Sequence, residues 1–142
     1  MLRKILAAAC FALLGSSPVY ALPFQADSQI TVSSYISVNN TTAVVVKPTS
    51  GTVYSIDGFN NSTTLAYIKL YNASSATCGS GTPVARYLIP YGASSAGGGF
   101  NISNINGDAY QNGIVMCITG GIADSDTTAP AANAYIVNIH LK

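Results

Sequence analysis

Cys78 and Cys117 are the residues of this chain with the clearest chemical potential. A third cysteine, Cys10, lies in a predicted export leader, so the mature chain keeps an even pair. In an oxidising compartment such a pair is expected to form one disulfide. Closing a loop of about forty residues would restrict the unfolded chain by about 4 kcal/mol on the chain-entropy model. The alternative is two reduced cysteines, with Cys117 filling space beside Met116 and Ile118.

The other candidates for catalysis or metal binding are one histidine and five aspartates. His140 lies two residues from the C-terminus, and no Asp or Ser can be assigned to it, so we interpret it as an ordinary edge-of-sheet histidine rather than a catalytic base. Two thiols and one imidazole have no recognisable metal-ligand spacing. The aspartates are expected in loops, in turns or at the mature N-terminus, which argues against a pair of glycosidase carboxylates. We therefore predict no catalytic residue, no metal and no cofactor.

The segment Asp124-Ser-Asp126-Thr-Thr128 is a possible exception, because it offers several oxygens to a hard cation such as calcium. The spacing lacks the glycine and the distal glutamate of a helix-loop-helix calcium site. Asp and Ser in a loop flanked by glycine also cap turns with their own side chains. A self-capped loop is the preferred interpretation, with calcium as the alternative.

The first 21 residues predict a cleaved signal peptide. Arg3 and Lys4 precede an uncharged apolar run from Ile5 to Leu14, and Val19-Tyr20-Ala21 offers small residues for cleavage. The run is about ten residues long, whereas a spanning helix needs about twenty, so no membrane anchor is expected after cleavage. Lipidation at Cys10 is the less favoured alternative, because little apolar segment precedes it. Residues 22–142 are therefore expected to be exported, to the periplasm or the cell exterior.

The mature chain is poor in charge. Charged residues make up 8% of the sequence, and it contains no Glu and no Trp. From Leu22 onward four cations oppose five aspartates, which gives a formal charge of minus one: Lys47, Lys69, Arg86 and Lys142 against Asp27, Asp57, Asp108, Asp124 and Asp126. No basic patch is available to neutralise phosphates, which argues against nucleic-acid binding. The roughly 121 mature residues match one domain.

The elements that must carry these residues are strands. In Leu65–Tyr71 one alternating face is wholly apolar (Ala66, Ile68 and Leu70), and the other mixes apolar residues with Lys69 and two tyrosines. Similar segments, separated by Gly, Asn and Pro turns, recur along the chain: Ile30–Val38, Thr42–Lys47, Thr52–Phe59, Val84–Ile89, Phe100–Ile105, Ile114–Thr119 and Tyr135–Leu141. Gly92–Gly99 and Gly120–Ala132 are expected to be loops, and Gly107–Gly113 a turn region. Ile114–Thr119 is expected to be buried, with apolar residues on both faces. The sequence predicts an all-β, antiparallel two-sheet sandwich of about eight strands with jelly-roll-like topology. Immunoglobulin-like connectivity remains open.

A series of short motifs resembles a family of small bacteriophage virion structural proteins. The series runs through Tyr67-Ile-Lys-Leu-Tyr-Asn72, Gly81-Thr-Pro-Val84, Ile89-Pro90, Gly113-Ile114, Ile118-Thr-Gly-Gly121, Ala123-Asp-Ser-Asp-Thr127 and Val137-Asn138, and covers roughly residues 52–142. The resemblance implies a non-enzymatic β domain that decorates capsids or belongs to tail structures, often as an oligomer. The export leader departs from that pattern, because a virion protein assembled in the host cytoplasm does not need one.

Two functions follow as expectations. The first is a structural protein that self-assembles, or docks on a larger particle such as a virion, through apolar and tyrosine-bearing faces. The alternative is a secreted or cell-surface module that binds carbohydrate, or mediates adhesion, through Tyr, Asn and Asp side chains on loops.

Overall fold

The computed structural model describes residues 30–37, 41–92 and 97–142, which form eight strands and no helix. The strands are β1 (Thr31–Ile36), β2 (Val44–Lys47), β3 (Gly51–Asn60), β4 (Ala66–Asn72), β5 (Ala85–Ile89), β6 (Gly98–Tyr110), β7 (Ile114–Thr119) and β8 (Tyr135–Leu141). Accordingly, no helix in the described part of the chain is long and apolar enough to cross a membrane. The predicted signal peptide, residues 1–21, lies outside the described residues.

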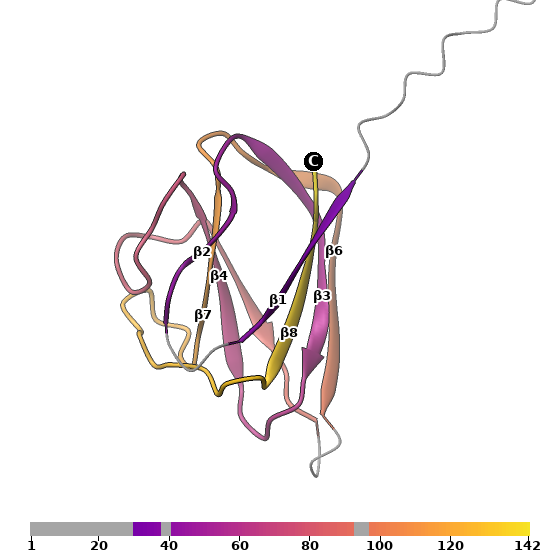
Figure 1. The fold of residues 1–142 in the computed structure, drawn as a ribbon, viewed down its shortest axis with the longest axis vertical. Coiled ribbons are helices and arrows are strands. Elements are labelled where there is room, and N and C mark those ends of the chain that lie inside the picture. The colour runs from indigo at the N-terminus through magenta and orange to yellow at the C-terminus, as the bar shows by residue number, and fades with distance from the viewer. Residues whose placement is uncertain (1–29, 38–40, 93–96) are drawn as a thin grey trace, which may run out of the picture.

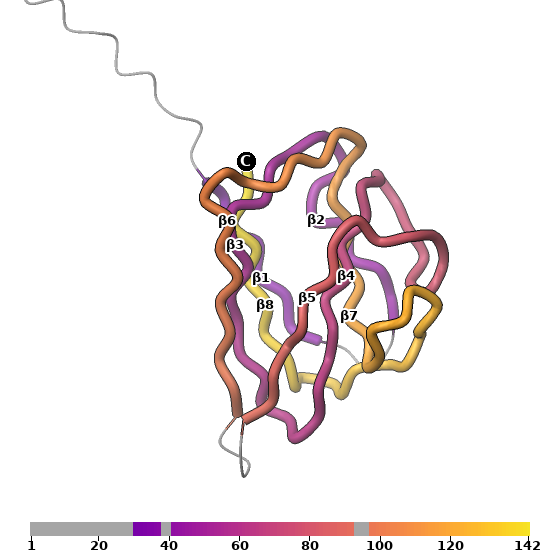
Figure 2. The backbone as a smooth tube through the Cα atoms, turned by 180° about the vertical axis from the view of Figure 1, so that it is seen from behind, coloured from indigo at the N-terminus to yellow at the C-terminus, as the bar shows by residue number. Residues whose placement is uncertain are grey.

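The eight strands form two antiparallel four-stranded sheets, which confirms the predicted sandwich. One sheet has the order β1-β8-β3-β6 and the other β2-β7-β4-β5. They lie as two layers, visible from both sides in Figures 1 and 2. The sheet that contains β1 is called the β1 sheet, and the sheet that contains β2 is called the β2 sheet. The pairing is nested: β1 pairs with β8, β2 with β7, β3 with β6, and β4 with β5.

The core lies between the sheets and consists of the inward-facing residues of the central strands. From the β2 sheet it takes Ile68, Leu70, Ile114 and Met116, and from the β1 sheet Val53, Ile56, Val137 and Ile139, together with further buried neighbours. Each of these side chains is at most 3% exposed. Burial at about 25 cal/mol per Å² of apolar surface is the main force that holds the two sheets face to face.

The alternation in Leu65–Tyr71 predicts the inward face of β4 correctly. Ala66, Ile68 and Leu70 are fully buried in the core. On the opposite face, which is mixed in the sequence, Lys69 is also fully buried and Tyr71 is only 5% exposed. Something beyond the two sheets must therefore cover this side of the β2 sheet.

Two expectations about the strands differ from the structure. β6 runs over Gly98–Tyr110, so it includes two glycines assigned to a loop and residues assigned to a turn. Asp57 lies in β3 and Asp108 in β6, so the expectation that the aspartates occupy loops or turns is wrong for these two. Within the expected strand Ile30–Val38, and within the loop Gly92–Gly99, residues 38 and 93–96 lie outside the described residues.

Candidate interaction surface

The outer face of the β2 sheet is covered by a loop that a disulfide holds in place. Cys78, in the segment between β4 and β5, is joined to Cys117 of β7, with 5.7 Å between the Cα atoms, and this is the predicted pair. Around the bond Tyr71, Val115 and both cysteines form a second small core. Gly79, at φ 80°, follows directly, and a side chain there would collide with Thr127 of the neighbouring loop. The two loops therefore pack against each other over this sheet.

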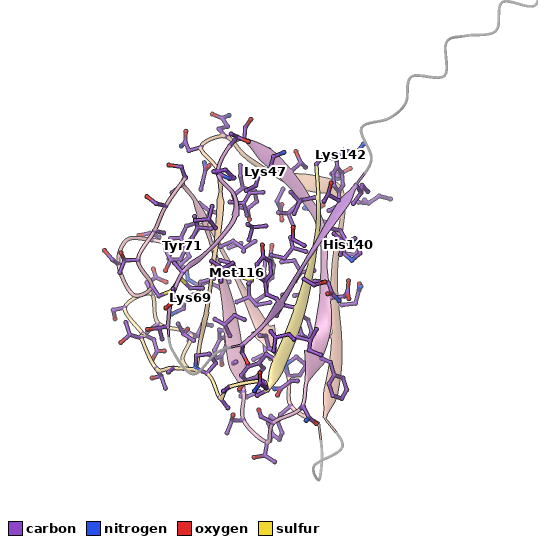
Figure 3. The ribbon with its side chains drawn as sticks, viewed as in Figure 1. Lys47, Lys69, Tyr71, Met116, His140 and Lys142 are labelled. Atoms are coloured by element: carbon purple, nitrogen blue, oxygen red, sulfur yellow. A yellow bond between two sulfur atoms is a disulfide. The ribbon has the colours of Figure 1, made fainter. Side chains whose placement is uncertain are left out.

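The second covering loop, residues 120–134, is fastened by Lys69. The Lys69 ammonium donates hydrogen bonds to the backbone carbonyls of Ala123 (2.5 Å) and Asp126 (3.3 Å). Desolvation lowers the pKa of Lys69, although the charges of Asp126 and Asp124 oppose this. Arg86 of β5 and Asp124 form an exposed ion pair, with 2.5 Å between Arg86 Nη2 and Asp124 Oδ1. This pair connects the same loop to the edge of the sheet. Figure 3 shows Lys69 and Tyr71 on the side of the β2 sheet that faces away from Met116 and the core.

The same contacts account for the oxygens that suggested calcium in Asp124–Thr128. Asp126 accepts hydrogen bonds from the backbone N–H groups of Gly121 (2.9 Å) and Thr128 (3.1 Å) and from the Thr128 hydroxyl (3.1 Å). Desolvation acts to raise the pKa of Asp126, but these hydrogen bonds and the charge of Lys69 outweigh it and the pKa is lowered. The loop's oxygens thus serve as turn caps and as acceptors for a lysine. Among the described residues no group of three or more His, Cys, Asp and Glu side chains gathers to hold a metal.

The outer face of the β1 sheet, by contrast, carries an array of polar side chains. Cross-strand register places one residue from each strand in a line: Ser34, Asn138, Asp57 and Asn101, here called the polar row. Ser34 donates to Asn138 (2.6 Å), and the Asn138 amide donates to Asp57 (2.9 Å). Two residues further along the strands Ile36, Ile136 and Phe59 form an exposed apolar row.

His140 lies beside this polar row. β8 is a central strand between β1 and β3, so the expectation of a histidine at a sheet edge is wrong. Its Nε2 lies 2.5 Å from Asp57 Oδ1, and it is about a third exposed. Figure 3 shows His140 on the β1 sheet, on the side away from Met116. The hydrogen bond from Asn138 is the main reason that the pKa of Asp57 is lowered, and His140 adds to it, while desolvation opposes both. The imidazole thus takes part in a hydrogen-bonded surface array.

Most of the described tyrosines do not form an interaction surface, because they lie in or against the cores. Tyr71, Tyr110 and Tyr135 are buried, and Tyr35 and Tyr87 pack on the main cluster. Burial, assisted by the neighbouring Asp108 carboxylate, raises the pKa of Tyr87 to about 12. These five tyrosines therefore serve packing, as is usual for tyrosine in half-buried strand positions.

The four edge strands differ in how they are protected from pairing with another chain. β2 is four residues long, has a register shift after Val45, and ends in Lys47 before Pro48. β5 is five residues long, contains Arg86, and lies between Pro83 and Pro90. Short length, bulges, charge and proline are the devices by which proteins protect sheet edges. β6 is longer, but its register with β3 shifts between Ser103 and Asp108, so it too is irregular at its centre, and it carries Asp108.

β1 has neither charge nor proline nor glycine, and it turns its more apolar side outward. Tyr35 faces the core with Val137, its register partner in β8. The alternate residues Val32 and Ile36 are therefore directed outward, and they are 51% and 61% exposed. No other described strand pairs with the far edge of β1. This strand, which we call the open edge, combines unpaired backbone with exposed aliphatic side chains.

Sequence reasoning predicted the disulfide but missed the open edge, the polar row and the Lys69 contacts. The alternation of Ile30, Val32 and Ile36 indicates a strand with one apolar face. It does not say whether that face is directed inward or whether the strand lies at a sheet edge. The Asp57–His140 pair joins residues 83 positions apart, so only strand order could have revealed it.

No protein-family model matches this sequence, and a comparison with curated proteins finds no significant match.

Proposed function

We propose that this protein is a non-enzymatic structural module that assembles with other chains through the open edge. The single observation that carries the proposal is the contrast between β1 and the edges of the β2 sheet. β2 and β5 carry charge and adjoin proline, whereas β1 exposes Val32 and Ile36 beside an unpaired backbone. An exposed apolar edge strand is a template for pairing with another strand, and strand addition is a common mode of protein association.

The covered face of the β2 sheet supports a structural role. A disulfide, a buried lysine and an ion pair hold two loops against that sheet. A depression of about 510 Å³ opens beside Gly121 and Asp126, but the Asp126 carboxylate there is already occupied by three donors. With the resemblance to small phage virion proteins, this favours a decoration or tail-associated protein, exported or virion-associated, that docks on a larger assembly.

Light scattering of the mature domain, residues 22–142, tests the proposal. The wild-type domain is expected to be a dimer or larger at micromolar concentration. The double variant Val32→Lys with Ile36→Lys is expected to be a monomer, because it places two cations on the open edge, and edge lysines oppose pairing. Ile122→Lys is the matched control: its side chain is 58% exposed, close to that of Ile36, but lies on the loop over the β2 sheet. A monomeric wild-type domain would refute assembly through β1.

The polar row supports a second candidate function, carbohydrate binding. Amide, carboxylate, imidazole and hydroxyl groups lie along one flat face, with the Phe59 ring, 39% exposed, two residues away on β3. Neutral sugars are bound by planar polar side chains next to an aromatic or apolar platform. Retention of the wild-type domain on an array of neutral glycans, lost in Asn138→Ala and kept in Ile122→Lys, is the expected result. Equal retention of both variants would exclude this face.

A further inference from the structure

The open edge presents a defined set of backbone groups. In an antiparallel pair, alternate residues direct both N–H and C=O toward the same neighbour. The Ser37 N–H donates to the Tyr135 carbonyl at 2.9 Å, so Ser37 and, by alternation, Tyr35 and Ser33 are directed toward β8. The backbone groups of Val32, Ser34 and Ile36 are therefore directed away from β8, toward the open edge.

We infer that the partner of this edge is a second copy of the chain, with β1 pairing antiparallel to the partner's β1 about a twofold axis at Ser34. This inference rests on the assembly role proposed above. In this register Val32 of each copy is opposite Ile36 of the other, and Ser34 is opposite Ser34. The three residues with outward-directed backbone groups then form three hydrogen-bonded pairs, or about six backbone hydrogen bonds.

The side chains favour this register. Val32 and Ile36 are both about half exposed or more, and cross-strand aliphatic pairs stabilise antiparallel strands. A register slipped so that Ser33 lies on the axis would place Val32 opposite Ser34 instead. β1 itself carries no charge, so two copies meet without repulsion along the seam. A twofold, self-complementary contact is also the commonest symmetry of protein dimers.

The inferred dimer has one continuous eight-stranded sheet, since each copy contributes the four strands of its β1 sheet. Its outer face would join the two polar rows, because Ser34 is the member of the row that lies on the edge strand.

Engineered cysteines at neighbouring positions of β1 test the register. With Ser34 on the axis, the two Cα atoms of position 34 are about 5.5 Å apart, within the range that a disulfide spans. Ser34→Cys is therefore expected to give a covalent dimer under mild oxidation, at several times the yield of Ser33→Cys. Ser103→Cys is the control for cross-linking by random collision, because Ser103 is exposed on β6, at the other edge of the same sheet. Intact-mass analysis confirms that Cys78 and Cys117 remain paired with each other.

The outcomes separate this inference from the proposed function. If light scattering shows an oligomer but Ser33→Cys cross-links best, or neither β1 variant exceeds Ser103→Cys, the twofold register is wrong while assembly stands. If the wild-type domain is a monomer, both fail. Preferential cross-linking of Ser34→Cys, together with a wild-type mass of two chains, supports the dimer.

Discussion

The Asp57 carboxylate links β3 to β8, because it accepts a hydrogen bond from Asn138 and pairs with His140. Its pKa is lowered mainly by the hydrogen bond from Asn138, with a smaller contribution from His140. A carboxylate whose folded pKa lies below its unfolded value of about 3.9 stabilises the fold above that value. This stabilisation is lost as the pH falls through the lowered folded pKa. We therefore expect part of the acid-induced loss of stability, below about pH 4, to come from Asp57.

The variant Asp57→Asn should show a shallower decrease of the free energy of unfolding below about pH 4 than the wild-type protein. Asp124 and Asp126, whose pKa values are also lowered, account for the slope that remains. Urea unfolding between pH 2 and pH 7 measures the effect. Asn138→Ala is the companion variant, because removing the main donor should move the Asp57 pKa toward its ordinary value in a carboxyl NMR titration. Identical pH profiles for Asp57→Asn and wild type would contradict the role of this carboxylate.

Lys69 gives a second prediction at the residue scale. Lys69→Met keeps most of the buried side-chain volume but removes the donor to the carbonyls of Ala123 and Asp126. Hydrogen bonds to a charged group contribute about 1.5–3 kcal/mol, so we expect a loss of about 2 kcal/mol in urea unfolding. Faster amide exchange in residues 121–128 should accompany it. Arg86→Met, which breaks only the exposed pair with Asp124, should have a much smaller effect. Equal losses in both variants would mean that Lys69 does not fasten the loop.

At the scale of elements, the disulfide holds the loop between β4 and β5 against β7. It joins residues 39 positions apart, and the chain-entropy model assigns such a cross-link about 4 kcal/mol. Reduction, or the double variant Cys78→Ala with Cys117→Ala, should therefore lower the urea midpoint strongly without abolishing the sheets, since the main core contains neither cysteine. Far-UV circular dichroism of the reduced domain checks that the strands persist. Complete loss of β structure in native buffer would show that the fold itself depends on the bond.

The strands could be predicted from the sequence because their pattern is local. Alternation correctly identified Ala66, Ile68 and Leu70 as inward, and the apolar run in β7 as buried on both faces. β6 was expected to end at Ile105, because Gly107 resembles a turn signal, yet β3 pairs with β6 as far as Tyr110. The turn signal still has an effect, because the register shifts there: Asn104–Gly107 have no partner in β3, and pairing resumes at Asp108.

The candidate surface could not be predicted in the same way, because it depends on strand order. In the sequence Lys69 lies on the mixed face of its strand, and only the loop that folds back over β4 explains its burial. Val32 and Ile36 lie on the more apolar face of β1, yet Tyr35 on the opposite face packs inward instead. A period of two identifies two faces of a strand but does not say which face is buried.

In the described part of the molecule, the two outer faces differ in what covers them. Loops, a disulfide and a buried cation close the face of the β2 sheet, while the face of the β1 sheet carries the polar row and leads to β1, an edge strand without charge or proline. An assembly built on this plan would present its cross-linked side to the surroundings and use the β1 edge for contact.

The sparse charge of the molecule gives a last prediction about that contact. β1 carries no ionisable side chain other than Tyr35, which packs on the core. In the inferred dimer the attraction between copies would therefore come from backbone hydrogen bonds and aliphatic contacts rather than from ion pairs. Screening by salt weakens interactions between exposed charges but leaves such contacts largely unaffected. The dimer dissociation constant, measured by sedimentation, should therefore change by less than about threefold between 0.05 and 1 M NaCl, equivalent to less than about 0.7 kcal/mol. A much weaker dimer in high salt would indicate that charged loops, and not the β1 edge, form the interface.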